Sequence, residues 1–122
     1  WVGSSQFDTW RRDPLPIAVY EQASLGRRSA INSLAVQGRP HKVVYNSSSL
    51  AGQIAAVESG LAVAALTQCS VPDHLQMLGP EHGLGPLEPM QVAAYRSRAS
   101  QGSRAVDSLH RMLVQTLRHA AT

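Results

Sequence analysis

Short runs of apolar residues alternate with segments of helical periodicity in the first half of the chain. Residues 15–20, 41–46 and 61–66 are apolar runs with the length of strands, and the last run is apolar throughout. Residues 26–37 and 50–59 instead gather apolar side chains on one helical face, and a glycine follows each segment. This alternation, with short connections, predicts a parallel βαβαβ unit of the α/β class whose third strand is buried on both faces.

The pattern changes after residue 66. A short strand is predicted at residues 75–78, and residues 79–89 hold three glycines and three prolines, which predicts a loop. Apolar and polar residues alternate over residues 90–96, which predicts a further strand. A last helix follows and runs to about His119. The apolar stripe of this helix consists of Val106, Leu109, Leu113 and Leu117. Such a stripe must pack on another surface, part of which we expect to lie outside this chain.

The beginning of the chain is polar and rich in turn residues. We therefore expect residues 1–14 to be a connector that enters the domain. Trp1 and Val2 form an apolar pair that would ordinarily continue a strand, and no initiator methionine precedes them. We expect the chain to be part of a longer protein.

Composition narrows the class of protein. Hydrophobic residues make up 43% of the chain and charged residues 16%, which is typical of a globular domain. The net charge is +3, but the arginines are scattered and no basic run alternates with aromatic residues, so a nucleic-acid groove is not indicated. No apolar run approaches the roughly 20 residues of a membrane span, and no signal peptide is recognisable, so we expect a cytoplasmic protein without a membrane partner.

The residues that usually carry catalysis or bind metals form no pattern here. Cys69 is the single cysteine, which excludes an intramolecular disulfide. The five histidines lack metal-ligand spacing, and no nucleophile, histidine and acid follow one another in a catalytic order. We therefore expect no metal, no cofactor and no enzyme activity. Cys69 is either inert packing or an oxidant sensor.

Candidate binding residues follow two of the predicted strands. Parallel α/β sheets bind ligands beyond the carboxyl ends of their strands, where helix N-termini offer unpaired N–H groups. Tyr20 and Glu21 follow the first strand, and residues 46–49 (NSSS) lie between the second strand and a helix. Ser48 or Ser49 is either a helix cap alone or part of a site for a small carboxylate. We expect ligand hydrogen bonds from Asn46, Ser47 and Ser48 and a wall from Tyr20. Glu21 either favours a cationic or amide-bearing ligand or faces water.

Several strings, in this order, resemble the regulatory half of LysR-type transcriptional regulators. They are PLP at 14–16, GRP at 38–40, SLAG at 49–52, VESGLAVAAL at 57–66 and AYR at 94–96. The fourth is similar to a family run in which a helix ends at glycine and turns directly into a buried strand. Together these strings span nearly the whole chain. Thr67 departs from the family pattern, which often has proline there.

The resemblance implies a fold like that of type II periplasmic binding proteins, with two lobes and an effector cleft between them. Residues 1–14 would connect the lobes, residues 15–89 would form the second lobe, and residues 90–122 would add a return strand and a helix to the first. It also implies a small-molecule effector that contacts the residues named above together with Ser49 and Thr67. DNA binding would come from a winged helix-turn-helix absent from this chain. Regulatory domains of this family usually pair side by side, so we expect a homodimer or higher oligomer, with residues 26–37 as a candidate contact helix.

Two other functions remain open at this stage. A solute-binding protein of the same fold, serving transport, would carry a signal peptide upstream of Trp1 where a regulator carries a helix-turn-helix. An enzyme with the same two-lobed architecture would need an acid–base pair in the cleft, and Glu21 is the one candidate that we can name.

Overall fold

The computed structural model describes residues 1–120, and contacts divide the chain into two units. The first unit comprises Trp1–Leu66 and Ser70–Glu88. The second comprises Thr67–Cys69 and the residues from Pro89 onward. Each unit is described by itself below.

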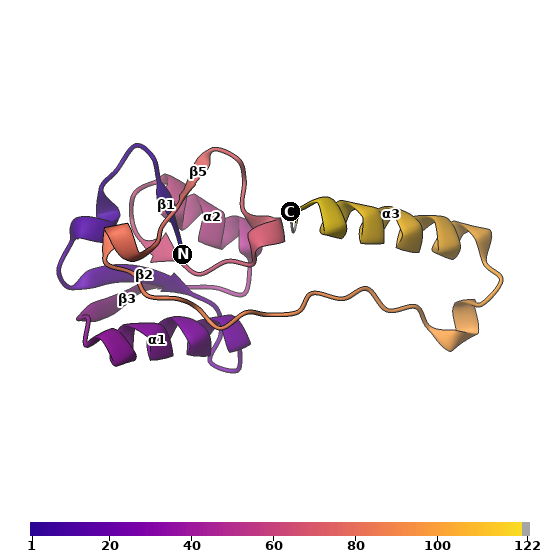
Figure 1. The fold of residues 1–122 in the computed structure, drawn as a ribbon, viewed down its shortest axis with the longest axis horizontal. Coiled ribbons are helices and arrows are strands. Elements are labelled where there is room, and N and C mark those ends of the chain that lie inside the picture. Colours follow the sequence, from indigo (N-terminus) through magenta and orange to yellow (C-terminus); the bar gives the residue numbers. More distant parts are fainter. Residues whose placement is uncertain (121–122) are drawn as a thin grey trace. The chain divides into compact units, whose positions relative to one another are not determined.

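The first unit is built on a five-stranded sheet with the order β3-β2-β4-β1-β5 (Figure 1). The strands are β1 (Val2–Ser4), β2 (Leu15–Val19), β3 (His41–Asn46), β4 (Val63–Ala64) and β5 (Leu75–Met77). The central strand β2 is parallel to both of its neighbours, β3 and β4. β1 is antiparallel to β4 and β5. The predicted parallel βαβαβ core is therefore confirmed.

Two helices cover opposite faces of this sheet, α1 (Leu25–Gln37) and α2 (Leu50–Glu58) (Figure 1). Side chains alternate between the faces along β2. Leu15, Ile17 and Val19 join the apolar cluster that contains Leu34 of α1, whereas Ala18 joins the cluster that contains Val57 of α2. Because both faces are covered, β2 is buried at every position.

Local signals explain where the helices begin and end. The Ser24 hydroxyl accepts a hydrogen bond from the N–H of Arg27 and caps α1, and the Ser49 hydroxyl accepts one from the N–H of Gly52 and caps α2. At the other end of α1, Gly38 has a φ of 65°, a left-handed conformation that favours glycine. Both helices therefore begin and end within one residue of the positions expected from the sequence.

Besides the third predicted strand, which shortens from residues 61–66 to Val63–Ala64, two segments differ from the sequence-based expectation. Residues 1–14, expected to be a connector, contain the strand β1 and a 3-10 turn, η1 (Thr9–Arg11). Trp1 and Val2 are buried in the clusters on the two faces of the sheet. The second difference concerns residues 90–96, which form no strand, so the prediction of a return strand is wrong for this structure. An extended segment becomes a strand only when a neighbour completes its hydrogen bonds, and the alternating pattern contains no information about that neighbour.

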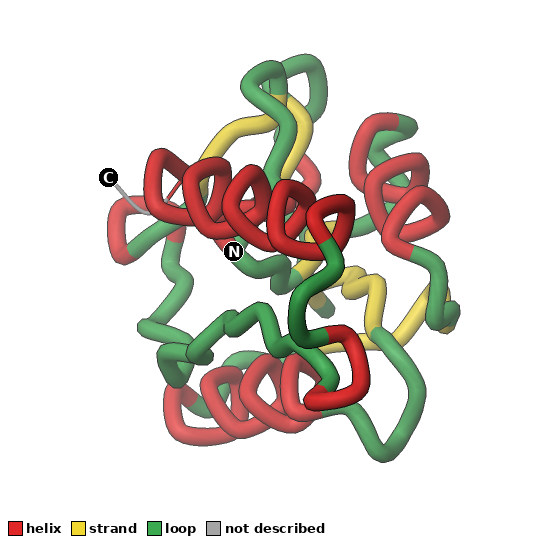
Figure 2. The backbone as a smooth tube through the Cα atoms, turned by 90° about the vertical axis from the view of Figure 1, so that its right-hand side faces the viewer, coloured by secondary structure: helices red, strands yellow, loops and turns green. Residues whose placement is uncertain are grey.

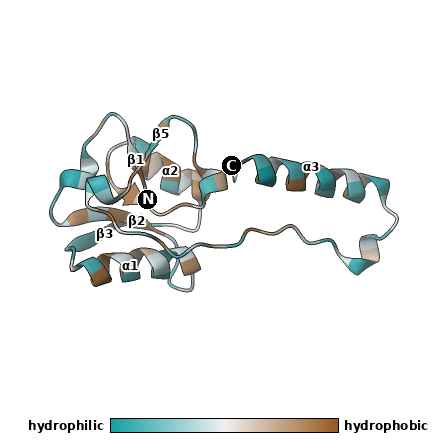
Figure 3. Ribbon diagram, viewed as in Figure 1, coloured by the Kyte–Doolittle hydropathy of each residue, from teal (hydrophilic) through white to brown (hydrophobic). Residues whose placement is uncertain are grey.

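The second unit carries one long helix, α3 (Arg104–Ala120), as predicted. An ion pair between Arg96 and Asp107 joins the segment before the helix to its first turn. No residue of α3 is buried among the described residues. Leu109 of the predicted stripe is 58% exposed, and Figure 3 shows brown apolar positions between teal polar ones along this helix.

Loops occupy much of the first unit, and Figure 2 shows how short the strands are beside them. Within residues 1–120, no helix has both the length and the apolar character needed to cross a membrane.

Candidate functional site

The candidate site lies where the parallel strands β2 and β3 end. Val19 and Asn46, the last residues of the two strands, are register partners. The N–H of Ser47 donates to the carbonyl oxygen of Val19 at 3.1 Å, so the turn after β3 is tied to the end of β2. This arrangement brings Tyr20 and Glu21 to the same edge of the sheet as residues 46–49. We call these six residues the carboxyl edge.

Gln53 of α2 holds this edge together from inside. Its side chain is fully buried, and its Nε2 donates to the carbonyl oxygens of Val19 at 2.8 Å and Ser47 at 2.9 Å. Its Oε1 is buried and has no hydrogen-bond partner among the described residues. Gln53 was not among the site residues expected from the sequence. A polar residue on the buried face of an otherwise apolar helix was the available signal.

The structure separates the roles of the three serines. Ser49 caps α2, and the Ser47 hydroxyl accepts a hydrogen bond from the N–H of Ser49 at 3.1 Å. The hydroxyl oxygens of Ser47 and Ser49 are therefore each occupied by a hydrogen bond from a backbone N–H. Ser48 and Asn46 are exposed, and among residues 1–120 their side chains have no intramolecular hydrogen bond. Ser48 and Asn46 are thus the two polar side chains of this turn that are available to a ligand.

The edge also has a positive electrostatic character. The N–H groups of Leu50 and Ala51 lie in the first turn of α2, where no helical carbonyl precedes them, and the helix dipole adds partial positive charge. Beside the neighbouring strand β2, Arg27 of α1 donates from Nη1 to the carbonyl oxygen of Tyr20 at 3.0 Å. The Arg27 guanidinium is therefore held at the end of β2. Arg27 was also missed, because its helical position does not reveal which strand end it reaches.

Tyr20 and Glu21 differ in their surroundings. Tyr20 is half-buried, and its burial raises the pKa of the phenol above its ordinary value. Its hydroxyl is therefore neutral and able to donate throughout the physiological range. Glu21 is exposed, so the alternatives for this residue stay open.

Thr67 and Cys69 belong to the second unit. Thr67 comes three residues after β4, and its place beside the carboxyl edge remains a prediction. The Cys69 sulfur lies 3.8 Å from the hydroxyl oxygen of Thr67, and Cys69 is neither fully buried nor fully exposed. This geometry fits both of the roles considered for Cys69.

Comparison with known proteins gives two findings. Residues 9–118 match the LysR substrate binding domain family. Over 87 residues the chain is 40% identical to the HTH-type transcriptional regulator DgdR of Burkholderia cepacia, an alignment that covers 71% of this chain and 30% of that protein. The chain thus spans less than a third of the length of this relative. Since the family match runs from η1 to the last turns of α3, the chain belongs to the LysR substrate binding domain family.

Proposed function

We propose that this chain is the effector-sensing part of a LysR-type transcriptional regulator of the bacterial cytoplasm. In this proposal it binds a small molecule in a cleft between two lobes and does no catalysis. Binding would shift the whole protein between two states that differ in affinity for the effector and in their engagement of DNA through a winged helix-turn-helix outside this chain. The relative described above is named as a transcriptional regulator, which favours sensing over solute transport.

The observation that carries the proposal is the carboxyl edge. Two strand ends, the first turn of α2 and the Arg27 guanidinium meet there, and the side chains of Asn46 and Ser48 remain exposed beside them. Hydrogen-bond donors next to a helix N-terminus favour an anion. We therefore propose a small carboxylate as the effector, with Asn46 and Ser48 as direct donors and Tyr20 as a wall. Ser47 and Ser49 shape the turn that presents them, while Glu21 and Thr67 border the ligand.

The test is a thermal-shift screen of small carboxylates on the whole natural protein, followed by titration of the hits. We expect Asn46→Ala and Ser48→Ala to weaken binding of a hit about tenfold each, which is the loss of roughly one charge-assisted hydrogen bond. Ser5→Ala is the matched control, because Ser5 is an exposed serine outside the edge. Unchanged affinity in both edge variants would contradict the proposed site.

We also propose that the protein associates through α1 and the sheet-edge strand β3. Leu25 and Val36 of α1 are 61% and 89% exposed, and Val43 and Val44 of β3 are 37% and 36% exposed. Apolar side chains on a helix beside an unpaired strand edge suit a two-fold contact between copies. Val36→Lys together with Val44→Lys should shift the oligomer toward monomer in light-scattering measurements, whereas an unchanged mass would exclude this face.

Residues 90–122 belong to the first lobe in this proposal; residues 121–122 lie outside the described part of the chain. The support comes from two features that each need a partner, an alternating segment at 90–96 without a strand neighbour and an exposed apolar stripe on α3. Amide hydrogen exchange on the whole protein tests this assignment. Slow exchange along α3 (Arg104–Ala120) is expected in the whole protein, and exchange as fast as in an isolated helix would contradict the assignment to the first lobe.

A further inference from the structure

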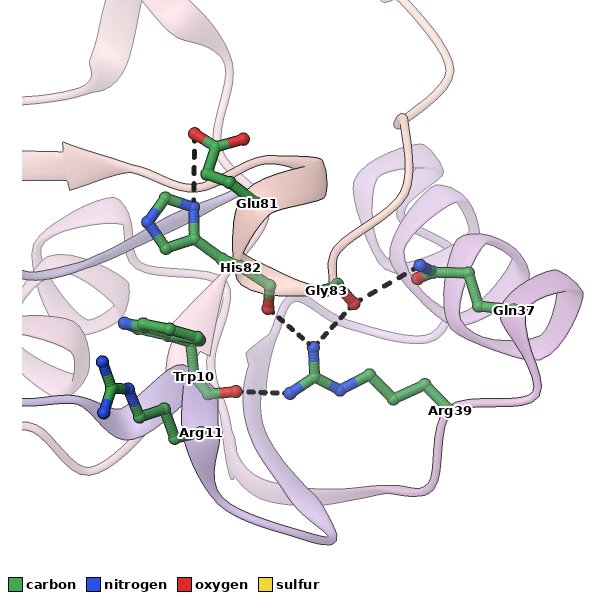
Figure 4. A pocket seen from close by; sticks show the side chains of 7 residues that line it. All are labelled: Trp10, Arg11, Gln37, Arg39, Glu81, His82 and Gly83. Atoms are coloured by element: carbon green, nitrogen blue, oxygen red, sulfur yellow. Dashed lines mark hydrogen bonds and ion pairs between the residues drawn. The ribbon is translucent and has the colours of Figure 1, made fainter.

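A hollow lies at the opposite end of the sheet from the carboxyl edge. It measures about 580 Å³ and is lined by Trp10, Arg11, Gln37, Arg39, Glu81, His82 and Gly83 (Figure 4). Arg39 and Pro40 lead into β3, and the N–H of Leu15 at the start of β2 donates to the carbonyl oxygen of Pro40. Since β2 has five residues, its first and last residues are about 13 Å apart at ~3.3 Å per residue. We call this site the Trp10 hollow.

Arg39 organises the hollow. Its Nη1 donates to the carbonyl oxygens of Gly83 at 2.7 Å and His82 at 3.1 Å, and its Nη2 donates to that of Trp10. Three backbone carbonyls hold the guanidinium in place, yet no carboxylate pairs with it within residues 1–120. Its Nε–H and one Nη2–H have no hydrogen-bond partner there either. A fixed, half-buried cation with spare donors and no counter-charge favours an anionic ligand.

The other lining residues supply an apolar surface and a movable rim. The Trp10 ring contacts the imidazole of His82, with ring centroids 4.8 Å apart and nearly perpendicular planes. The Arg11 guanidinium lies 4.8 Å from the centre of the Trp10 ring, and the Arg11 side chain is 65% exposed, so it can swing aside or close over a ligand.

The side chain of His82, like that of Arg39, is held in place. Its Nδ1 accepts a hydrogen bond from the N–H of Gly79 at 3.1 Å, and its side chain is only 10% exposed. On the opposite side of the hollow, the Gln37 amide donates to the carbonyl oxygen of Gly83 at 3.3 Å. The lining therefore presents two arginines, one exposed glutamate and an indole, and Arg11 also forms an ion pair with Asp8 at 3.6 Å.

We infer that the Trp10 hollow is a second ligand site, which binds a small monoanionic carboxylate with a flat apolar body. The carboxylate meets the spare N–H groups of Arg39, and Arg11 adds an exposed positive charge at the rim, while the apolar body lies against the Trp10 indole. The hollow is shallow and largely open to solvent, so the Arg39 donors and the indole face, rather than enclosure, would hold the ligand. The site is separate from the carboxyl edge, because it uses no residue of that edge and lies beyond the other end of β2 and β3.

Calorimetric titration of the whole natural protein with benzoate tests the inference, with uncharged benzamide as the matched probe. The titrations use a Ser48→Ala background, so that loss of the proposed effector site cannot be mistaken for loss of the hollow. Benzoate should bind, and benzamide should bind at least about tenfold more weakly because it lacks the charge. The fluorescence change on benzoate binding should disappear in Trp10→Phe.

Two substitutions at the exposed rim change the charge without touching the Arg39 clamp. Arg11→Gln should weaken benzoate binding about fivefold, and Glu81→Gln should tighten it about twofold by removing a like charge. Arg28→Gln, which removes an exposed arginine of α1 outside the hollow, should have no effect. Absence of benzoate binding, equal binding of benzamide, or affinity unchanged in both rim variants would overturn the inference. None of these outcomes bears on the carboxyl edge, which Asn46→Ala and Ser48→Ala test separately.

Discussion

Replacing Gln53 by leucine should destabilise the first unit by about 2 kcal/mol. This value is the sum of the free-energy changes expected for each contact that the substitution removes. The substitution removes both Nε2 hydrogen bonds, to Val19 at 2.8 Å and to Ser47 at 2.9 Å. The carbonyl of Val19 keeps the Ser47 N–H as a donor, so its loss is about 1 kcal/mol. The carbonyl of Ser47 loses its partner, which costs roughly 1–3 kcal/mol. Removing the buried, unpartnered Oε1 returns about 1 kcal/mol.

Urea unfolding measures this free energy. At a slope of roughly 1–3 kcal/mol per molar urea for a small domain, a loss of about 2 kcal/mol lowers the midpoint by ~1 M. A Gln53→Leu protein within about 0.5 kcal/mol of the wild type would refute the reasoning, because the two hydrogen bonds would then contribute nothing beyond what solvent supplies.

The substitution Gln53→Glu tests the same buried environment through the pH dependence of the free energy of unfolding. A carboxylate at this position would be buried and would face two carbonyl oxygens with no donor, so the pKa of the introduced carboxyl is raised in the folded state. A group with a raised folded pKa retains stability below its unfolded pKa, about 4.3 for glutamate, and loses it as pH rises through the folded value. The stability deficit relative to wild type should therefore grow from pH 4.5 to pH 8. A deficit independent of pH would mean that the carboxyl had turned out to solvent.

Three further predictions concern packing and ionisation. Gly52→Ala brings a Cβ within 2.5 Å of the Tyr45 hydroxyl oxygen and should destabilise by about 1–2 kcal/mol. In Tyr45→Phe the same change should be neutral or stabilising, because alanine exceeds glycine in helix propensity by ~1 kcal/mol; a double-mutant cycle decides. Leu34→Ala should cost about 3 kcal/mol in urea unfolding, since Leu34 is fully buried, whereas the exposed Val36→Ala should change stability by less than ~0.5 kcal/mol. Burial raises the pKa of Tyr20, so stability should fall as pH rises above about 10, and Tyr20→Phe should reduce that fall in thermal unfolding.

The fold of the first unit was largely predictable, because its signals are local. The apolar run of β2, the Ser24 cap and the Gly38 stop each act within a few residues of where they stand. The parallel arrangement followed from the order strand, helix, strand. By contrast, β1 has three residues and was assigned to a connector. Its pairing with β4 and β5 is non-local, and no property of its own sequence specifies those partners.

The carboxyl edge was predictable as a place in the fold, but its contacts were not, and ligand binding there stays a prediction. The rule that ligands bind beyond the carboxyl ends of parallel strands indicated Asn46 and Ser48. It could not separate them from Ser49, whose side chain caps α2, because a serine before a helix fits both roles equally. Gln53 and Arg27 act through strand ends that are distant in sequence, so their contribution depends on packing that only the fold reveals.

The stripe on α3 and the alternation over residues 90–96 share one physical explanation. A periodic apolar pattern indicates which face of a helix or strand is suited to burial, but it does not provide the surface against which that face packs. Helices and strands of the first unit meet that requirement because α1 and α2 lie across a sheet that the same unit provides. In the second unit the pattern is equally regular, yet Leu109 and Val92 stay 58% and 48% exposed among the described residues. The difference between the units is therefore one of available partners rather than of propensity, and the family match, which runs from residue 9 to residue 118, includes both the alternating segment and most of α3.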